Sequence, residues 1–374
     1  MNRESDLNRV PQPHVQQMVA QLPFEIVDHI IGYLDFEDVR SIARVCSAFR
    51  LPAQIRLFRT IYTYARPTRP QFCTAHIKSI LSSPHLLQCP SRLRVECTMG
   101  VLMQHPSIQL LWPHLPVMHR LRDVYISLEP GQCSRALSAL ESLGSGREIA
   151  LSLGRILAPD LLISDNPLPI HALELWVDAS SHQVGKRLIQ KCSQSLRQLR
   201  LFLQDNRTPP LPFLPHLSDL FLHTQLHGVG NEPDLMSLFP YLTQHPTITR
   251  IILGYEFTLS GRPPPNLLPD LQFLVATPPI IERLIPGRPV NDIHAIYTSQ
   301  TADRYPVDIM LRPLRESFVP VTSLAISAGI HLPNDSVINI VRSLPKLRRF
   351  TLWWSCKYEV RRLRRQKVFG IDWN

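Results

Sequence analysis

A short pattern of apolar residues recurs along most of the 374-residue chain and limits the folds that the chain can adopt. Apolar residues occupy its first, fourth and sixth positions, as in LSDLFL. Clear copies begin at Leu121, Ile170, Leu196, Leu217, Ile248, Leu271, Val321 and Leu347, and weaker copies begin near Pro90, Gly146 and Val290. Such alternation is typical of a strand with one buried face. The chain is therefore predicted to contain a series of short strands.

Helix patterns lie in several of the intervals between these strands. They are predicted over residues 134–143, 182–192, 234–242 and 335–344. Pro240 should end or kink the third of them early, because proline cannot donate a backbone hydrogen bond. Alternation of strands and helices requires parallel strands that are joined by right-handed crossovers.

The spacing of the copies defines the predicted fold class. Their average interval of about 26 residues is inside the range of leucine-rich repeats. One unit of this size cannot bury its leucines alone, whereas stacked units share a continuous core. We therefore expect an irregular leucine-rich-repeat-like α/β solenoid over residues 63–357, irregular because the usual asparagine after the strand is missing from most copies. An ordinary α/β domain with leucine-rich strands is the alternative.

Residues 22–62 predict three short helices. Pro23 suits the first position of a helix, where its missing N–H is not needed. Asp35 can cap a second helix, and Pro52 can begin a third. The expected apolar stripes are Ile26, Val27, Ile30, Ile31 and Leu34 in the first helix, Val39, Ile42, Ala43, Cys46 and Phe49 in the second, and Ile55, Phe58, Ile61 and Tyr62 in the third.

Three helices in about 40 residues cannot bury all of this apolar surface among themselves, because domains so small are marginal without a partner. Leu22, Pro23, Ile26 and Ile30 are the expected outward-facing residues. Either they contact another protein, or the helices form a cap that packs on the rest of this chain. Composition and periodicity leave both alternatives open.

The stretch LPFEIVDHIIGYLDFEDVRSIARVCSAFR resembles an F-box. Phe49 stands where the family more often has tryptophan, and Val39 stands where it more often has leucine. The phrases VTSLAIS and LPKLRRFTLWW are similar to the distal repeats of fungal F-box proteins with degenerate leucine-rich repeats. The residues that carry the F-box resemblance are Leu22, Pro23, Glu25, Ile26, Ile30, Leu34, Asp38, Val45, Cys46 and Phe49.

The resemblance implies a partner and a function. The partner is a Skp-type adaptor and, through it, a cullin scaffold. The chain would be the non-catalytic substrate-recognition subunit of a ubiquitin ligase. The alternatives are an adaptor-bound scaffold without ubiquitin transfer and a basic nucleic-acid-binding repeat protein. The implied adaptor contacts are Leu22, Pro23, Ile26, Ile30, Leu34, Val45, Cys46 and Phe49.

A client-binding face follows from the strand pattern. Side chains at the third, fifth and seventh positions project opposite to the buried ones. Aromatic and arginine side chains are enriched at protein-binding hot spots. We expect this face to bind a client protein, unless loops cover Trp176 and Trp353. The candidate client contacts are Glu174, Trp176, Arg200, Phe202, Phe221, Arg349 and Trp353.

Composition limits the remaining options. The formal charge of +10 is compatible with nucleic acid, an anionic membrane, an acidic protein or a solvated basic surface. The seven cysteines contain no CxxC pair, and we expect no signal peptide or membrane span, so a cytoplasmic or nuclear protein is predicted.

Residues 1–20 are expected to be a flexible segment, and residues 21–62 the F-box. Residues 358–374 are expected to be a basic tail for nuclear import, nucleic-acid contact or solubility.

No pattern predicts catalysis, a cofactor or a metal. The fragment GVGNEP lacks the third glycine of a phosphate-binding loop. His223 and His227 have no third ligand near them in sequence. The proline-rich segments 206–215 and 261–270 are predicted to be extended loops, or alternatively PxxP ligands for a third protein.

Overall fold

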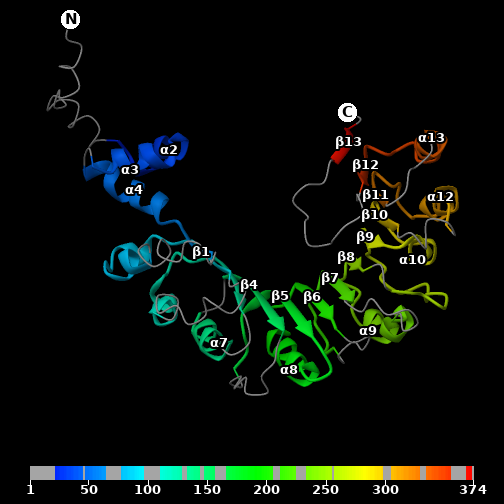
Figure 1. Cartoon of the computed structure of the whole chain (residues 1–374), viewed down its shortest axis with the longest axis horizontal. Coiled ribbons are helices and arrows are strands. Elements are labelled where there is room, and N and C mark those ends of the chain that lie inside the picture. The colour runs from blue at the N-terminus through cyan, green and yellow to red at the C-terminus, as the bar shows by residue number, and fades with distance from the viewer. Residues whose placement is uncertain are drawn as a thin grey trace, which may run out of the picture. The chain divides into compact units, whose positions relative to one another are not determined.

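The computed structural model shows two compact units, Met1–Ile149 and Ala150–Asn374. The chain is α/β, with helices near its N-terminus followed by parallel strands (Figure 1). The described residues are 22–44, 47–64, 77–96, 110–128, 133–143, 147–155, 166–204, 211–224, 233–254, 257–297, 305–328, 334–354 and 368–372.

The first unit begins with three helices that share a small core. They are α2 (Phe24–Tyr33), α3 (Phe36–Ile42) and α4 (Ser47–Leu57). Pro23 precedes α2 in an extended conformation, and the Asp35 carboxylate accepts a 2.9 Å hydrogen bond from the backbone N–H of Asp38, so Asp35 caps α3 as predicted. The core residues are Val27, Ile31, Val39, Phe49 and Ala53.

The third helix differs from the prediction. It begins at Ser47, and Pro52 lies inside it. Phe49 and Ala53 are four residues apart on one face of α4, and both are buried, so packing holds the helix together through the proline. The prediction that Ile61 and Tyr62 are helical is wrong. They lie in strand β1 (Thr60–Tyr64), whose β-branched and aromatic residues favour a strand.

The rest of the first unit contains parallel strands. Ile61 of β1 pairs with Leu93 of β2 (Arg92–Glu96), and Leu93 pairs with Val124 of β3 (Asp123–Leu128). These three side chains are buried. The other named elements of this unit are η1 (Leu86–Gln88), η2 (Trp112–Val117) and α7 (Cys133–Glu141), and β4 (Glu148–Arg155) contains the boundary with the second unit.

The second unit contains a parallel sheet whose strands follow one another in sequence order. The predicted strand pattern is confirmed, because its copies in this unit coincide with parallel strands. The final strand, β13, is antiparallel to β12 and lies within the predicted basic tail. The strands are β5 (Ile170–Val177), β6 (Gln198–Leu203), β7 (Asp219–Thr224), β8 (Arg250–Leu253), β9 (Phe273–Ala276), β10 (Asp292–Tyr297), β11 (Ser323–Ala328), β12 (Arg349–Trp354) and β13 (Val368–Asp372).

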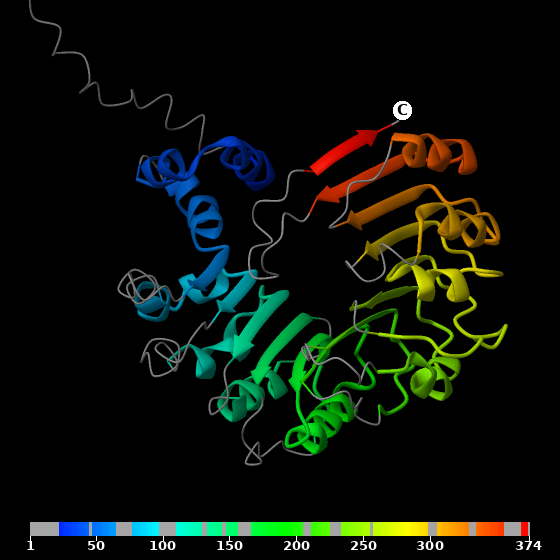
Figure 2. The same ribbon diagram turned by 45° about the vertical axis from the view of Figure 1, so that its right-hand side comes forward.

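The helices of the second unit lie along one side of its sheet (Figures 1 and 2). Pro240 is in the first turn of α9, which directly follows η3, so the helix predicted over residues 234–242 is divided in two next to this proline. Two helices were not expected, α10 and α12, because α10 is short and Pro313 interrupts the pattern of α12. The helices are α8 (His182–Cys192), η3 (Leu235–Leu238), α9 (Phe239–Thr243), α10 (Pro278–Leu284), α12 (Val307–Arg315) and α13 (Asn334–Ser343).

Hydroxyl side chains link successive turns of the second unit. The Oγ of Ser195 lies 2.9 Å from each of the carbonyl oxygens of Leu168 and Ile170. Ser317 contacts the carbonyl oxygens of Arg288 and Val290 in the same way, at 2.9 and 2.7 Å. Each set of contacts links the segment that precedes one strand to the segment at the start of the previous strand. None of the described helices has the length and apolar character needed to cross a bilayer.

Candidate docking surfaces

The first candidate surface is an exposed apolar stripe on α2. Ile26 and Ile30 of α2 are 47% and 38% exposed, whereas Val27 and Ile31 of the same helix are buried. Leu22, which precedes the helix, is 39% exposed. Residues four apart lie on one face of a helix. The side chains that were expected to face outward therefore do so, and the core of the three helices is formed without them.

Tyr33 extends this stripe by one turn, three residues after Ile30, and is 77% exposed. Its hydroxyl lies 3.3 Å from Nε2 of His29, and the two rings meet edge to face at 5.0 Å. Sequence reasoning missed Tyr33, although its spacing from Ile30 was a usable signal. We define the helix stripe as Leu22, Ile26, Ile30 and Tyr33.

Other predicted adaptor contacts have different environments. Phe49 is buried, so its side chain belongs to the internal core and does not face outward as predicted. Leu34 is partly buried and packs against the same core. Pro23 is exposed. Val45 and Cys46 lie outside the described residues.

Further apolar side chains of the three helices are exposed. They are Phe24, Phe36 and Leu51, which are 44%, 63% and 51% exposed. The sequence prediction did not include them, since it assigned only residues of the helical stripes and of the F-box pattern. The three helices thus expose more apolar surface than was expected, which favours a protein partner.

The second candidate surface is the face of the sheet formed by β5, β6 and β7. Glu174 pairs in register with Arg200 and Arg200 with Phe221, and one row further along Trp176 pairs with Phe202. The buried leucines of these strands alternate with them. Five of the predicted client contacts are therefore brought together on three adjacent strands.

Aromatic rings on this face are packed against one another. The indole of Trp176 and the ring of Phe202 are stacked, with centroids 4.6 Å apart and planes 12° apart. Phe202 also lies 5.2 Å from Phe221 and 5.8 Å from His223, the latter edge to face. We define the aromatic row as Trp176, Phe202, Phe221 and His223. Each of its members is partly exposed.

The charges on this face are paired. Arg200 lies 3.6 Å from the Glu174 carboxylate, which also accepts a 2.8 Å hydrogen bond from Ser152. Arg250 of β8 lies 3.0 Å from Asp219. The Arg250 guanidinium is also 4.5 Å from the ring centroid of Phe273 on β9. Each arginine is thus held beside a carboxylate, while about half of its side chain stays exposed.

Sequence reasoning located this face only in part. Arg349 lies on β12, separated from β7 by four strands, so it is not part of the same cluster. The side chain of Trp353 lies outside the described residues. Arg250 and Phe273 were missed, although both occupy the third position of their copies of the strand pattern, which was the signal used for the other strands.

The described residues offer no group of three or more histidine, cysteine, aspartate or glutamate side chains that could hold a metal ion. Cys192 is buried, and burial raises the pKa of its thiol, so it stays protonated and unreactive at neutral pH.

The chain matches a known family over part of its length. Residues 19–64 match the family model described as F-box-like. This segment contains the three helices and the helix stripe, and the predicted F-box resemblance is confirmed there. An F-box-like domain implies binding of a Skp-type adaptor and a substrate-adaptor role in ligases of the Skp–cullin–F-box type. No curated protein matches the chain.

Proposed function

We propose that this chain is the substrate-recognition subunit of a Skp–cullin–F-box ubiquitin ligase. The helix stripe would bind the Skp-type adaptor, and through it a cullin scaffold. The face that carries the aromatic row would bind a client protein. We place the protein in the cytoplasm or the nucleus, where such a ligase would meet its clients.

One observation carries the proposal. Ile26 and Ile30 are exposed on an α2 helix whose Val27 and Ile31 already fill the core, in a segment that matches an F-box-like domain. Exposed apolar anchors on a helix gain free energy when a groove in a partner removes them from water. Truncation of one such anchor typically costs about 2 kcal/mol, or about thirtyfold in affinity.

The second unit supports a role in client binding. We propose that its strands and helices form degenerate leucine-rich repeats in an irregular solenoid, similar to fungal F-box proteins. The aromatic row and the guanidinium groups of Arg200 and Arg250 are the side-chain types that protein hot spots favour. Their carboxylate partners leave this face nearly neutral, which favours a protein client over a nucleic acid.

No catalytic residue is required of this chain. F-box proteins are typically non-catalytic ligase subunits. A subunit that holds the client near an enzyme charged with ubiquitin converts a chance encounter into an effectively intramolecular reaction. The contribution of this chain to the rate would therefore come from binding and positioning alone.

A matched pair of variants tests the proposal in cells. I26D/I30D places two charges in the helix stripe, and I309D changes an isoleucine on α12 that is 44% exposed and outside the helix stripe. The I26D/I30D variant should lose the Skp-type adaptor and cause a client protein to accumulate, while I309D should behave as the unchanged chain. Loss of the adaptor with no accumulating client would favour an adaptor-bound scaffold. Retention of the adaptor by I26D/I30D would contradict the proposal.

A further inference from the structure

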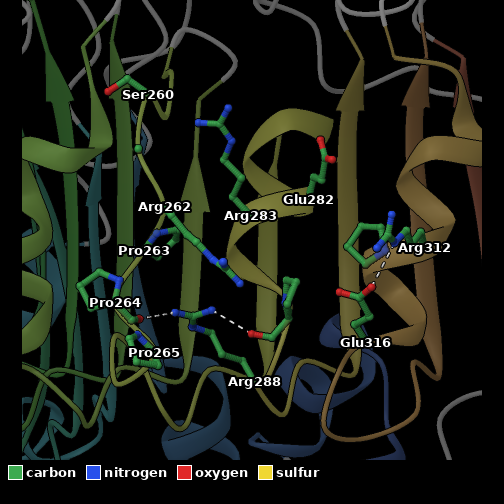
Figure 3. Close-up of a pocket in the computed structure, with 13 residues that line it drawn as sticks. Ser260, Arg262, Pro263, Pro264, Pro265, Glu282, Arg283, Arg288, Arg312 and Glu316 are labelled. Carbon is green, nitrogen blue, oxygen red and sulfur yellow. Dashed lines mark hydrogen bonds and ion pairs between the residues drawn. The ribbon is translucent and has the colours of Figure 1, made fainter.

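A cavity of about 1040 Å³ opens on the helix side of the second unit (Figure 3). Its walls are the proline-rich segment 260–265, the end of α10 with the residues that follow it, and α12. It belongs to neither candidate docking surface. Its volume is at the upper end of small-molecule sites, which span roughly 300–1,000 Å³.

Arg288 fixes the base of this cavity. It is only 3% exposed, and its guanidinium donates to the carbonyl oxygens of Leu267 and Pro264, at 2.7 and 3.0 Å. It also donates to the carbonyl oxygens of Leu284 and Pro286, at 2.7 and 3.1 Å. All four acceptors are neutral, so the positive charge has no carboxylate in this network. Burial lowers the pKa of the guanidinium, but arginine still stays charged at neutral pH.

The hydrogen bonds of Arg288 also bear on whether the proline-rich segment can bind another protein as a PxxP ligand. A PxxP ligand must leave its backbone and proline rings free to enter another protein's groove. Here Pro263 is buried and the carbonyl of Pro264 is bound to Arg288. The segment is therefore a rigid wall of the cavity, and the alternative that it serves as a PxxP ligand loses its support.

Two further arginines border the cavity. Arg262 is exposed and projects from the proline-rich segment into the space beside α10 (Figure 3). Arg283 of α10 donates to the carbonyl oxygen of Leu259, which connects the helix to the opposite wall. Arg262 is thus the cation that is best placed to reach a ligand.

The carboxylates of the lining do not cancel this charge. Glu316 is paired with Arg312, with 3.2 Å between the Arg312 Nε and a Glu316 oxygen. Glu282 lies on α10 and is exposed. The lining therefore contains four arginines and two glutamates. One of the glutamates, Glu316, is already neutralised by one of these arginines, Arg312. Between these charges the rings of Pro264, Pro265 and Pro313 supply apolar wall.

We propose that this cavity binds a small organic anion, with its phosphate or carboxylate oxygens on Arg262 and its apolar ring against the prolines. Guanidinium groups bind both kinds of oxyanion through paired, charge-assisted hydrogen bonds. The buried charge of Arg288 attracts the anion further, since it acts in surroundings that water screens poorly. The site is independent of the proposed ligase function.

Calorimetric titration of the full chain with model ligands tests this inference. The probes are phenyl phosphate, benzoate, inorganic phosphate and the neutral compound phenol, each at low ionic strength. R262M removes the charge from the cavity. R187M makes the same change at an exposed position of α8 outside the cavity. R262K keeps the charge but loses the fork of donors.

We expect phenyl phosphate to bind the unchanged chain and R187M equally, and R262M about tenfold or more weakly, since charge-assisted hydrogen bonds are strong. R262K should lie between them, and phenol should not bind. Comparable binding of phenyl phosphate and benzoate would indicate a general oxyanion site, whereas a preference for phenyl phosphate would indicate a phosphate ester. Equal binding by R262M and the unchanged chain, or no binding of either ring-bearing anion, would overturn the inference.

Discussion

Ile30 and Ile31 are neighbours in sequence but have opposite environments on α2, with Ile30 38% exposed and Ile31 fully buried. Ile31 packs with Val27, Val39 and Phe49 in the core of the three helices. Ile30 belongs to the helix stripe, for which we propose an adaptor as partner. Both side chains are isoleucine, so the same substitution at each position separates an effect on folding from an effect on adaptor binding.

The substitution I31A should lower the free energy of unfolding of the three-helix region by about 2–5 kcal/mol, because it leaves a cavity in a small core. The substitution I30A should change it by no more than about 0.5 kcal/mol, as is usual for exposed positions. Urea denaturation followed by far-ultraviolet circular dichroism measures both. Equal losses of stability would mean that Ile30 is also a core residue.

Client binding should depend on the aromatic row. W176A removes the indole that stacks on Phe202, and F318A removes a phenyl ring that is 81% exposed and outside this row. Proteins that are recovered with the adaptor-bound chain should be lost with W176A and retained with F318A, while both variants retain the adaptor. Quantitative mass spectrometry of the recovered proteins gives the comparison. Client recovery that is unaffected by W176A would exclude the aromatic row as a client contact.

His245 should make the second unit less stable in acid. Its Nε2 accepts a 2.8 Å hydrogen bond from the backbone N–H of Leu214, so Nδ1 carries the hydrogen that is donated to the carbonyl oxygen of Tyr241, at 2.7 Å. Burial lowers the pKa of His245, whereas an unfolded histidine titrates near about 6.5. The stabilisation is therefore complete above this value and is lost as the pH falls toward the folded pKa.

Urea unfolding at several pH values between about 5 and 8 measures this effect, a range that brackets the unfolded pKa of histidine. The chain with His245 should lose stability in the lower half of the range. H245Q cannot titrate, and its stability should depend less on pH. Parallel pH profiles for the two proteins would show that His245 has no part in the acid sensitivity.

Ser195 should stabilise the stacking of successive turns. Its hydroxyl reaches the carbonyl oxygens of Leu168 and Ile170. S195A should lower the free energy of unfolding by about 1 kcal/mol, the usual net contribution of such a hydrogen bond. Q194A, which shortens the exposed side chain at the preceding position, should have almost no effect. Thermal unfolding of both variants checks the difference, and equal midpoints would contradict it.

The sequence was most informative where one period dominates. In β6 and β7 a buried side chain, usually leucine, follows each more exposed one, and period-2 alternation is a reliable strand signal. Prediction was poorer where proline interrupts a pattern. Pro52 was assigned to a helix start, whereas the packing of Phe49 and Ala53 carries α4 through it. Tertiary packing of this kind is not visible in local periodicity.

The candidate sites could be predicted only partly for a related reason. Spacing identified Ile26 and Ile30 as outward-facing, whereas the family resemblance assigned Phe49 to the adaptor, because a family pattern does not say which apolar residues fill the core. The pairing of Arg250 with Asp219 depends on strand register, which joins residues 31 positions apart. The cavity beside Arg262 depends on contacts between three separate segments.

The most direct test of the central claim is the affinity of the purified chain for a purified Skp-type adaptor, measured by calorimetry for the unchanged chain, I26D/I30D and I309D. The proposal predicts that the unchanged chain and I309D bind equally well and that I26D/I30D binds at least about thirtyfold more weakly, with its helical circular dichroism unchanged. Equal affinity of all three proteins, or no binding by the unchanged chain, would contradict the claim that the helix stripe is an adaptor-docking surface.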